Sequence, residues 1–299
     1  MKTPVVFITG GRGFVGRATV LAFRAVGYAT YTIGHPRSGD DPQFHLPWTF
    51  DSIGELAGQM RVLQPSAIIH LAAAEPGATP DMHRQITVQS TDSLLKVMEQ
   101  ETPKATFIYL GSAAEYGESL FLDRPLCETD PCFPITPYGH AKHAASLLVL
   151  AARHRGLRTT VARLFTAIGP GMPRQSILGR ITFEIAQMSK EGNILHVGNL
   201  ETYRDFLDVR DVAQYLLKLA GSETGFPPVI HLCSGEAQKT REWVEALVAH
   251  SGKKIVLQTD PTFLRAHDPE KVVGSTDLMK LFGLIPRLPE MQKLMGEII

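Results

Sequence analysis

The stretch Val5-Val6-Phe7-Ile8-Thr9-Gly10-Gly11-Arg12-Gly13-Phe14-Val15-Gly16 decides the fold of this chain. Its first five residues form a short apolar run that is typical of a buried parallel strand. Residues 17–26 follow with a helical pattern. Gly10, Gly13 and Gly16 are spaced three apart, which permits a tight turn, close approach of backbone N–H groups to a pyrophosphate, and close helix packing. This order predicts a dinucleotide site, and the alternative is an ordinary glycine-rich turn.

Strand and helix patterns continue to alternate along the chain. We expect strands over residues 28–33, 43–48, 67–71, 106–110, 159–165, 196–197 and 229–232, and helices over residues 52–63, 82–100, 136–152, 177–190, 210–221 and 240–251. Such alternation is typical of an α/β protein with a doubly wound parallel sheet. His70 has apolar neighbours on both sides, which favours a hydrogen-bonded core histidine over a catalytic one.

Composition excludes several classes of function. The chain has 299 residues, with 44% apolar residues and 30 basic against 30 acidic side chains. Zero net charge argues against a nucleic acid or membrane surface held by bulk charge. No apolar run reaches the roughly 20 residues that span a bilayer, and the first residues reach glycine too early for a signal peptide. The cysteines are Cys127, Cys132 and Cys233, without a CxxC pair, so we expect reduced thiols, no metal site and a cytoplasmic location.

The end of the second expected strand bears on the choice of cofactor. An NAD site usually has Asp or Glu there, to bind the adenosine ribose, and residues 34–38 contain none. Arg37 lies in this segment and Arg12 lies in the glycine turn. Two guanidiniums without a carboxylate suit a 2′-phosphate, which favours NADP over NAD. NAD stays open, because both arginines can also be solvated loop residues.

Tyr138 and Lys142 are candidates for chemistry. They are four residues apart on a helix that Thr136 can cap, so they share a face. An ammonium group lowers the pKa of a nearby phenol, which would make Tyr138 an acid near neutral pH. The alternative is a solvated surface pair. Ser112 follows the expected strand 106–110, and ligands of open α/β sheets lie beyond such carboxyl ends.

Together these motifs resemble those of the extended short-chain dehydrogenase/reductase superfamily, in its nucleotide-sugar branch, the NAD-dependent epimerase/dehydratase family. Residues 163–171 are similar to the family's Arg-x-Phe-Asn-x-x-Gly-Pro-Gly segment, and residues 203–213 to its Arg-Asp-Phe-x-x-Val-x-Asp-x-Ala segment. Residues 111–117, 131–139 and 232–235 resemble the subgroup of GDP-4-keto-6-deoxyhexose reductases that form GDP-D-rhamnose. Thr166 is a departure, since the family usually has a substrate-holding Asn there.

The resemblance implies a Rossmann domain over residues 1–165 and a smaller α/β lobe over residues 166–299, from which residues 205–235 return in part to the Rossmann core. The lobe would bind a nucleotide-diphosphate sugar. The superfamily often forms homodimers through the Tyr/Lys helix and the helix before it. The apolar run 144–150 allows this contact, although a buried core face explains the run equally well.

The resemblance also assigns roles to residues. The catalytic residues would be Ser112, Tyr138 and Lys142. The cofactor would contact Gly10, Arg12, Gly13, Phe14, Val15, Gly16, Arg37, Leu71, Ala72, Ala73, Tyr138, Lys142 and Leu164, and the substrate would contact Ser112, Ala113, Thr166, Arg204 and Arg265. A local ion pair between Arg204 and Asp205 is the alternative for Arg204.

The expected reaction is NADPH-dependent reduction of the 4-keto group of a nucleotide-linked 4-keto-6-deoxyhexose, with a GDP-sugar preferred. A 4-epimerase would use the same Ser112, Tyr138 and Lys142 with a retained NAD. A 4,6-dehydratase needs a carboxylate two residues after Ser112, where this chain has Ala114; Glu115 comes next and, in an extended segment, points the other way. A sensor that binds NADP without turnover is the third alternative, and the intact Ser112, Tyr138 and Lys142 argue against it.

Overall fold

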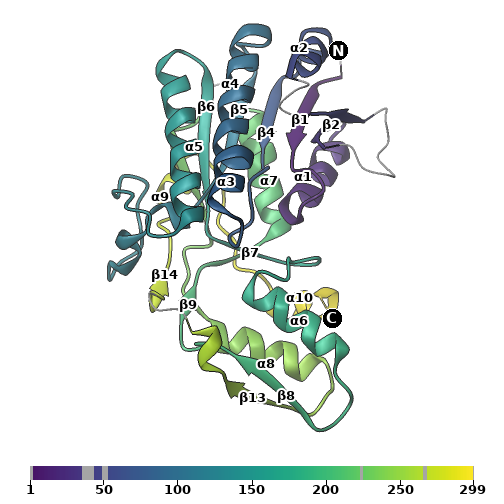
Figure 1. The fold of residues 1–299 in the computed structure, drawn as a ribbon, viewed down its shortest axis with the longest axis vertical. Helices are drawn as coiled ribbons and strands as arrows, with labels where there is room; N and C mark the ends of the chain where they lie inside the picture. The colour runs from purple at the N-terminus through teal and green to yellow at the C-terminus, as the bar shows by residue number, and fades with distance from the viewer. Residues whose placement is uncertain (1–2, 36–43, 49–52, 223–224, 265–267, 299) are drawn as a thin grey trace.

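Seven parallel strands form the central sheet of the protein (Figure 1). The strands are β1 (Val5–Thr9), β2 (Ala29–Gly34), β3 (His45–Pro47), β4 (Ala67–His70), β5 (Thr106–Ser112), β6 (Arg158–Leu164) and β11 (Val229–Leu232). Their spatial order is β11-β6-β5-β4-β1-β2-β3. The structure, a computed structural model, describes residues 3–35, 44–48, 53–222, 225–264 and 268–298.

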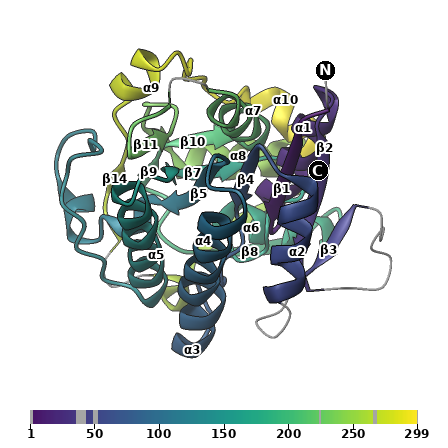
Figure 2. The same ribbon diagram turned by 90° about the horizontal axis from the view of Figure 1, so that it is seen from above.

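Helices cover both faces of this sheet, as Figure 2 shows from above. Helices α1 (Phe14–Ala25) and α7 (Val209–Ala220) pack together on one face. Helices α2 (Ile53–Leu63), α4 (Ser90–Glu101) and α5 (Pro137–His154) lie side by side on the other. This arrangement confirms the predicted doubly wound α/β fold. Within the described ranges, no helix has the length and apolar character needed to cross a bilayer.

Alternate residues of the central strands enter different cores. Val6 and Ile8 of β1 pack toward α1 and α7, while Phe7 between them packs toward α2 and α4. This follows from the period of two in a strand. Because both faces are buried, the strands read as continuous apolar runs in the sequence, as expected for a parallel sheet.

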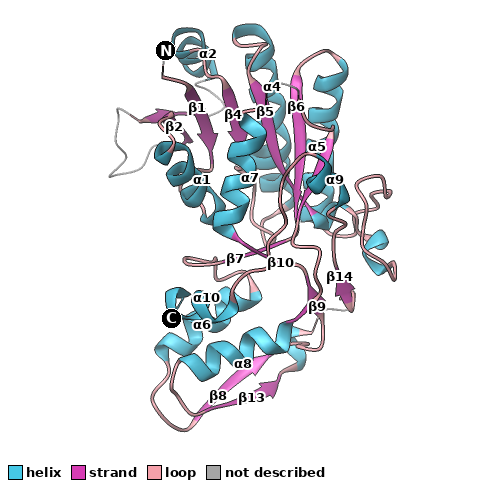
Figure 3. Cartoon of the chain, turned by 180° about the vertical axis from the view of Figure 1, so that it is seen from behind, coloured by secondary structure: helices cyan, strands magenta, loops and turns pink. Residues whose placement is uncertain are grey.

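The remaining elements form a smaller part at the carboxyl edge of the sheet (Figure 3). Its strands are β7 (Thr166–Ile168), β8 (Asn193–Val197), β9 (Tyr203–Arg204), β10 (Phe206–Asp208), β12 (Gln238–Lys239), β13 (Ile255–Thr259) and β14 (Lys271–Val272). Its helices include α6 (Ile177–Gln187), α8 (Thr240–His250) and α10 (Met291–Ile298), and α9 (Asp277–Leu281) lies against β11. A third core around Trp243, Ile181 and Leu294 holds α6, α8 and α10 together.

Asp205 connects distant segments of the smaller part. Its fully buried carboxylate accepts hydrogen bonds from the N–H of Ser234 (2.6 Å), from the Ser234 hydroxyl (2.7 Å), and from the N–H groups of Gly235 (3.0 Å) and Gly274 (3.2 Å). A buried carboxylate with four donors is a structural anchor. The Asp205 side chain thus joins three segments by hydrogen bonds: its own, between β9 and β10, the segment after β11, and the segment after β14.

Two details differ from the sequence predictions. The helix expected over residues 82–100 is a continuous run of α3 (Pro80–Met82), a π-helical turn η2 (His83–Gln89) and α4, and helical periodicity alone does not reveal such a turn. Strands β7, β9, β10, β12, β13 and β14 were not predicted, and all of them except β13 have only two or three residues, too few to show a periodic pattern. The prediction for His70 is confirmed: it is fully buried between the hydroxyls of Thr9 (2.6 Å) and Thr91 (3.0 Å).

The glycine turn generates a stability prediction. A Cβ on Gly16 would overlap the carbonyl oxygen of Gly10 and lie 2.7 Å from the Cα of Gly11, whereas one on Gly58 of α2 meets nothing within 4 Å. We therefore expect Gly16→Ala to lower the free energy of unfolding by about 1–3 kcal/mol, as overpacking does. Gly58→Ala should raise it by about 0.5–1 kcal/mol, because alanine is the better helix former. Urea unfolding followed by circular dichroism checks both, and equal effects of the two variants would contradict the argument.

Candidate active site

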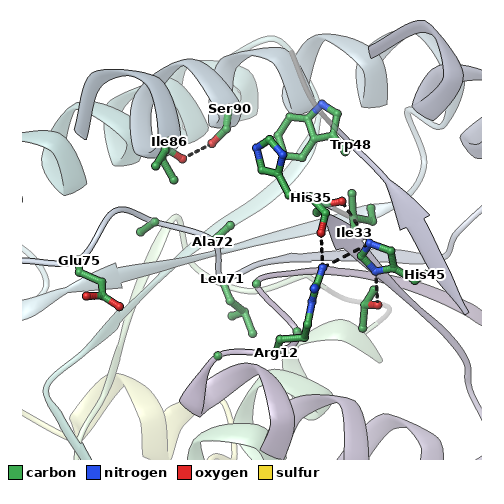
Figure 4. Close-up of a pocket in the computed structure, with 16 residues that line it drawn as sticks. Arg12, Ile33, His35, His45, Trp48, Leu71, Ala72, Glu75, Ile86 and Ser90 are labelled. Carbon is green, nitrogen blue, oxygen red and sulfur yellow. Dashed lines mark hydrogen bonds between the residues drawn. The ribbon is translucent and has the colours of Figure 1, made fainter. Parts of the chain in front are cut away.

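The carboxyl ends of the parallel strands meet at one edge of the sheet, where the strand order reverses between β1 and β4. Ligands of open α/β sheets bind in the crevice at such a point. A cavity of about 470 Å³ lies there and is drawn in Figure 4. It brings together six residues predicted at the cofactor: Gly10, Arg12, Gly13, Leu71, Ala72 and Ala73. Phe14, Val15 and Gly16 lie on the first turn of α1 behind it, and Leu164 ends β6.

The wall of this cavity at β1 is made of backbone. Gly10 has a φ of 66°, and a Cβ on it would lie 2.8 Å from the backbone nitrogen of Ala72. The N–H of Gly13 donates to the Gly10 carbonyl (2.9 Å), and α1 begins at the next residue. The first N–H groups of a helix have no partner within it and attract anions. The turn therefore fits the pyrophosphate of a dinucleotide.

Basic and imidazole groups gather at the end of β2. Arg12 donates a hydrogen bond to the His35 carbonyl, and its Nη2 lies 3.4 Å from His45 Nε2 (Figure 4). His45 also contacts the Gly34 carbonyl (3.2 Å) and the Thr32 hydroxyl (2.9 Å). Among the described lining residues the one carboxylate is Glu75, which Figure 4 shows far from Arg12. Arg37 lies outside the described residues.

His45 was missed at the sequence level. It lies 33 residues from Arg12, on a three-residue strand whose pairing with β2 has no local signal. A histidine followed by two apolar residues and a tryptophan reads equally well as a core strand. The parallel pairing of Thr32 with His45 brings the ring to the cavity.

Ser112, Tyr138 and Lys142 come from two adjacent elements. Ser112 ends β5, and its hydroxyl accepts a hydrogen bond from the N–H of Ala114 (3.2 Å) at the start of the 3₁₀ helix η3 (Ala113–Glu115). Tyr138 and Lys142 lie on α5, whose start Thr136 caps by accepting from the N–H of Gly139 (3.0 Å), as predicted. The structure thus places the three side chains at the carboxyl end of β5.

The segment after Ser112 differs from its prediction. An extended conformation was expected for residues 113–115, and they form a 3₁₀ turn because Ser112 caps it. The turn buries Glu115 completely, while Ala114 stands two residues after Ser112.

The pKa values run opposite to the predicted direction. Burial raises the pKa of Tyr138 to about 12, with an opposing contribution from the Ser112 side chain. Burial also lowers the pKa of Lys142 to about 8. The Lys142 ammonium, 3% exposed, donates to the Leu110 carbonyl (2.5 Å) and lies 4.7 Å from the centre of the Tyr109 ring. The predicted lowering of the Tyr138 pKa is therefore wrong, because desolvation of the phenol outweighs the contact with Ser112 that favours the phenolate.

His83 packs against Tyr138. Its ring centre lies 6.1 Å from that of Tyr138 in an edge-on arrangement, and it is 3% exposed. It opens the π-helical turn η2, which contacts α5. Tyr138 is therefore held between its own helix and the turn, and this packing accounts for part of its desolvation.

A second cavity, of about 360 Å³, lies in the smaller part. Its lining includes Arg180, Arg204, Asn199, Phe263 and Asp268. Arg204 donates to the Asp268 carboxylate (2.5 Å) and to the carbonyls of Tyr203 (2.8 Å) and Pro269 (2.9 Å). Its ion-pair partner is thus Asp268, so the alternative of an Arg204–Asp205 pair is wrong; Asp205 is the buried anchor described above.

The other predicted substrate residues are spread out. Thr166 starts β7, and its N–H donates to the Asp205 carbonyl (3.0 Å). Ala113 is buried in η3, and Arg265 lies outside the described residues. Sequence reasoning missed Arg180, whose guanidinium lies 4.1 Å from the centre of the Phe263 ring. The two are 83 positions apart, and no local pattern relates them.

One group of side chains has the composition of a metal site. Ligand atoms of Glu115, Cys132 and His143 lie within 4.8 Å of one another. However, the Arg163 guanidinium contacts Glu115 Oε2 at 3.2 Å, and this oxygen also faces His143 Nδ1 (3.9 Å). A guanidinium at this place disfavours the binding of a metal cation beside it. Cys127, Cys132 and Cys233 are free thiols. Burial raises the pKa of Cys132, which disfavours the thiolate that a metal needs.

The comparisons with known proteins agree on one family. Residues 6–230 match the NAD dependent epimerase/dehydratase family. A GDP-6-deoxy-D-mannose reductase from Pseudomonas aeruginosa is 33% identical over 283 residues, covering 91% of this chain and 88% of its own. A dTDP-6-deoxy-L-talose 4-dehydrogenase (NAD(P)(+)) from Kitasatospora kifunensis is 28% identical, covering 83% and 79%.

Solved structures agree. RMD from Pseudomonas aeruginosa complexed with NADPH has a TM-score of 0.78 and 29% identity, covering 99% of this chain and 98% of its own. UDP-glucose 4-epimerase from Brucella ovis in complex with NAD has a TM-score of 0.85 at 21% identity, covering 99% and 97%, and shows the shared fold.

The depressed pKa of Lys142 generates a prediction for stability against pH. Below about pH 8 the folded protein holds a buried ammonium at a cost, and the cost disappears as pH rises to 10.5, the ordinary lysine value, because the folded state then carries fewer protons than the unfolded state. The free energy of unfolding of the wild type should therefore rise by about 3 kcal/mol relative to that of Lys142→Met across this window. Chemical unfolding at a series of pH values measures it. The exposed Lys96→Met is the control, and parallel curves for wild type and Lys142→Met would contradict the shift.

Proposed function

The chain belongs to the NAD dependent epimerase/dehydratase family, and from this premise we propose that it reduces the 4-keto group of a nucleotide-linked 4-keto-6-deoxyhexose with NADPH. The family is NAD(P)-dependent, and its members compared above are named as reductases, dehydrogenases and epimerases of nucleotide sugars. A GDP-sugar is the preferred substrate. The name of the Pseudomonas aeruginosa reductase supports this choice, since that protein has the highest identity among those compared above.

NADPH, when bound, supplies the hydride for the carbonyl carbon. The residues of this chain then manage the oxygen. Tyr138 donates its proton to that oxygen, and the Ser112 hydroxyl hydrogen-bonds it. The Ser112 oxygen already accepts from the N–H of Ala114, so its proton is available for donation. Lys142 places a positive charge beneath the site, and by family resemblance it also holds the nicotinamide ribose.

The side chains at the end of β2 are the observation that favours a reductase over an epimerase. Arg12 and His45 meet there, and no described residue at that strand end offers a carboxylate to a ribose hydroxyl. A guanidinium suits a 2′-phosphate. NADPH is a reductant that is consumed, whereas an epimerase retains its NAD.

A dehydratase and a sensor have less support than the reductase. Ala114 takes the place of the carboxylate that a dehydratase needs, and Glu115 is buried. A sensor without turnover has no need of Ser112, Tyr138 and Lys142 in one place. The 4-epimerase remains the second candidate, because it uses the same three side chains.

The smaller part would bind the nucleotide diphosphate. Arg180 and Arg204 line one cavity, and two guanidiniums suit a diphosphate. Arg204 would then exchange its contact with Asp268 for the ligand. In the same proposal residues 1–165 serve the cofactor, and Arg265, Thr166 and Ala113 serve the substrate.

We also propose a homodimer through α5 and the helical run before it. Leu147 on α5 is 52% exposed, and Met82 on α3 is 45% exposed. Exposed apolar residues on adjacent helices suit an interface between copies.

The proposed reaction predicts a specific assay result. Purified protein should oxidise NADPH, followed by its absorbance, only when GDP-4-keto-6-deoxymannose is present. Tyr138→Phe should lower the rate at least about 100-fold, because the proton donor is lost. Tyr28→Phe, far from the site, is the control. Activity with a keto sugar linked to another nucleotide would change the substrate assignment but would support the same reaction. Retained NAD together with epimerisation of a UDP-hexose would replace the reductase by the epimerase.

The cofactor proposal has its own test. Arg12→Leu should reduce the preference for NADPH over NADH in kcat/KM by about 10- to 100-fold, the value of a charged hydrogen bond to phosphate. Arg24→Leu, at an exposed position on helix α1, which follows the glycine turn, should leave the preference unchanged. An unchanged ratio in Arg12→Leu would mean that Arg12 does not hold a 2′-phosphate.

A further inference from the structure

A buried carboxylate lies directly behind Ser112. Glu115 has no exposed side-chain surface, and its Oε1 accepts a hydrogen bond from the N–H of Ser112 (2.8 Å). In return the Ser112 hydroxyl accepts from the N–H of Ala114 (3.2 Å). These reciprocal bonds form a capping box around η3. The position of the Ser112 hydroxyl therefore depends on the Glu115 side chain.

The second oxygen of Glu115 is also used. Arg163, 4% exposed, donates to it from Nε (3.2 Å) and donates from Nη1 to the Tyr116 hydroxyl (3.0 Å). The Tyr116 hydroxyl in turn lies 2.5 Å from His231 Nε2. A carboxylate accepts on both oxygens, whereas an amide has one acceptor oxygen. A glutamine at this position could still accept from the Ser112 N–H, but it could not also accept from Arg163.

Titratable and charged groups surround this carboxylate on every side. They are Tyr109 on β5, Tyr116 directly after η3, Cys132 before α5, Tyr138, Lys142 and His143 on α5, and Arg163 on β6. Burial acts to raise the pKa of Glu115, but the interactions with His143, Arg163 and the Ser112 N–H outweigh it and lower the pKa. Glu115 is therefore ionised at neutral pH.

We propose that Glu115 is a positioning residue for the ketoreduction proposed above: its carboxylate fixes Ser112, and its buried charge lies behind the site that Ser112, Tyr138 and Lys142 form. The proposal rests on that function for its kinetic consequences. The charge acts in the required direction, because Glu115 raises the pKa of both Tyr138 and Lys142. Lys142 is the more sensitive group, since its pKa of about 8 lies close to neutral pH.

Two variants separate position from charge. Glu115→Asp keeps the charge but is one methylene too short to reach the Ser112 N–H, so we expect kcat to fall about tenfold with KM within about twofold. Glu115→Gln removes the charge, so the decline of kcat/KM at alkaline pH should begin about one pH unit lower than in the wild type. Glu128→Gln is the matched control: Glu128 is also largely buried and accepts one backbone N–H, from His231 (3.0 Å), but does not touch Ser112.

Two results would overturn the positioning role. One is a kcat of Glu115→Asp within twofold of wild type. The other is an undiminished tenfold loss when Glu115→Asp is made in a Ser112→Ala background, because a residue that acts through Ser112 has no further effect once the hydroxyl is gone. The charge role is overturned if Glu115→Gln does not change the pH at which kcat/KM begins to decline, or if Glu128→Gln shifts this pH by the same amount.

A measurement without substrate keeps this test independent of the proposed function. The pH window in which wild type gains stability over Lys142→Met reports the Lys142 pKa in the ligand-free protein. In the Glu115→Gln background the lower end of that window should move down by about one pH unit. An unmoved window overturns the charge role whichever sugar the enzyme uses, whereas a moved window together with no reduction of any keto sugar refutes the proposed reaction alone. Thermal unfolding of each variant confirms that it is folded.

Discussion

The close packing of α1 onto the glycine turn is the constraint on which the rest of the structure depends. Gly16 approaches Gly10 so closely that no side chain fits between the helix and the end of β1. Helix α1 therefore begins directly over the sheet edge and packs on α7 along the face that Val6 and Ile8 supply. The same approach leaves bare backbone around the cavity. One contact thus sets both the first core and the place where a pyrophosphate can lie.

Desolvation, more than pairing, sets the chemistry at the catalytic end. Lys142 is bound to the Leu110 carbonyl and has lost its water, so burial prevails over any effect it has on the phenol. Tyr138 consequently keeps its proton far above neutral pH. An acid of that kind gives its proton only to a strongly basic oxygen. In the proposed reaction, proton donation would then be coupled to the development of negative charge on the carbonyl oxygen, and premature ionisation of the tyrosine would be avoided.

The local elements could be predicted from sequence, and the contacts between distant ones could not. The strand at Val5, the glycine turn and the cap at Thr136 each depend on residues within one short segment, and the structure confirms them. The meeting of Arg12 with His45 depends on the register of β2 and β3. The extended conformation expected after Ser112 was wrong because Ser112 and Glu115 form a capping box, and their Ser-x-x-Glu spacing is a local signal that could have predicted the turn.

The same limit applies to electrostatics. The spacing of Tyr138 and Lys142 on one helix is visible in the sequence, but the depth at which they are buried is not. Burial depends on the η2 turn and on Tyr109, which approach from other elements. The sign of the pKa shift was therefore predicted wrongly although the pair itself was identified.

Asp205 has a consequence for how the protein is made. Its carboxylate is desolvated and relies on donors from Ser234, Gly235 and Gly274, the last of them 69 residues downstream. Burial already acts to raise its pKa, so the charge is expensive until all donors are in place. On the ribosome, the nascent chain up to β11 can pair its parallel strands, but the Asp205 carboxylate lacks one of its buried donors, and so keeps its hydration, until Gly274 has emerged. The packing around Asp205 is therefore completed only late in synthesis.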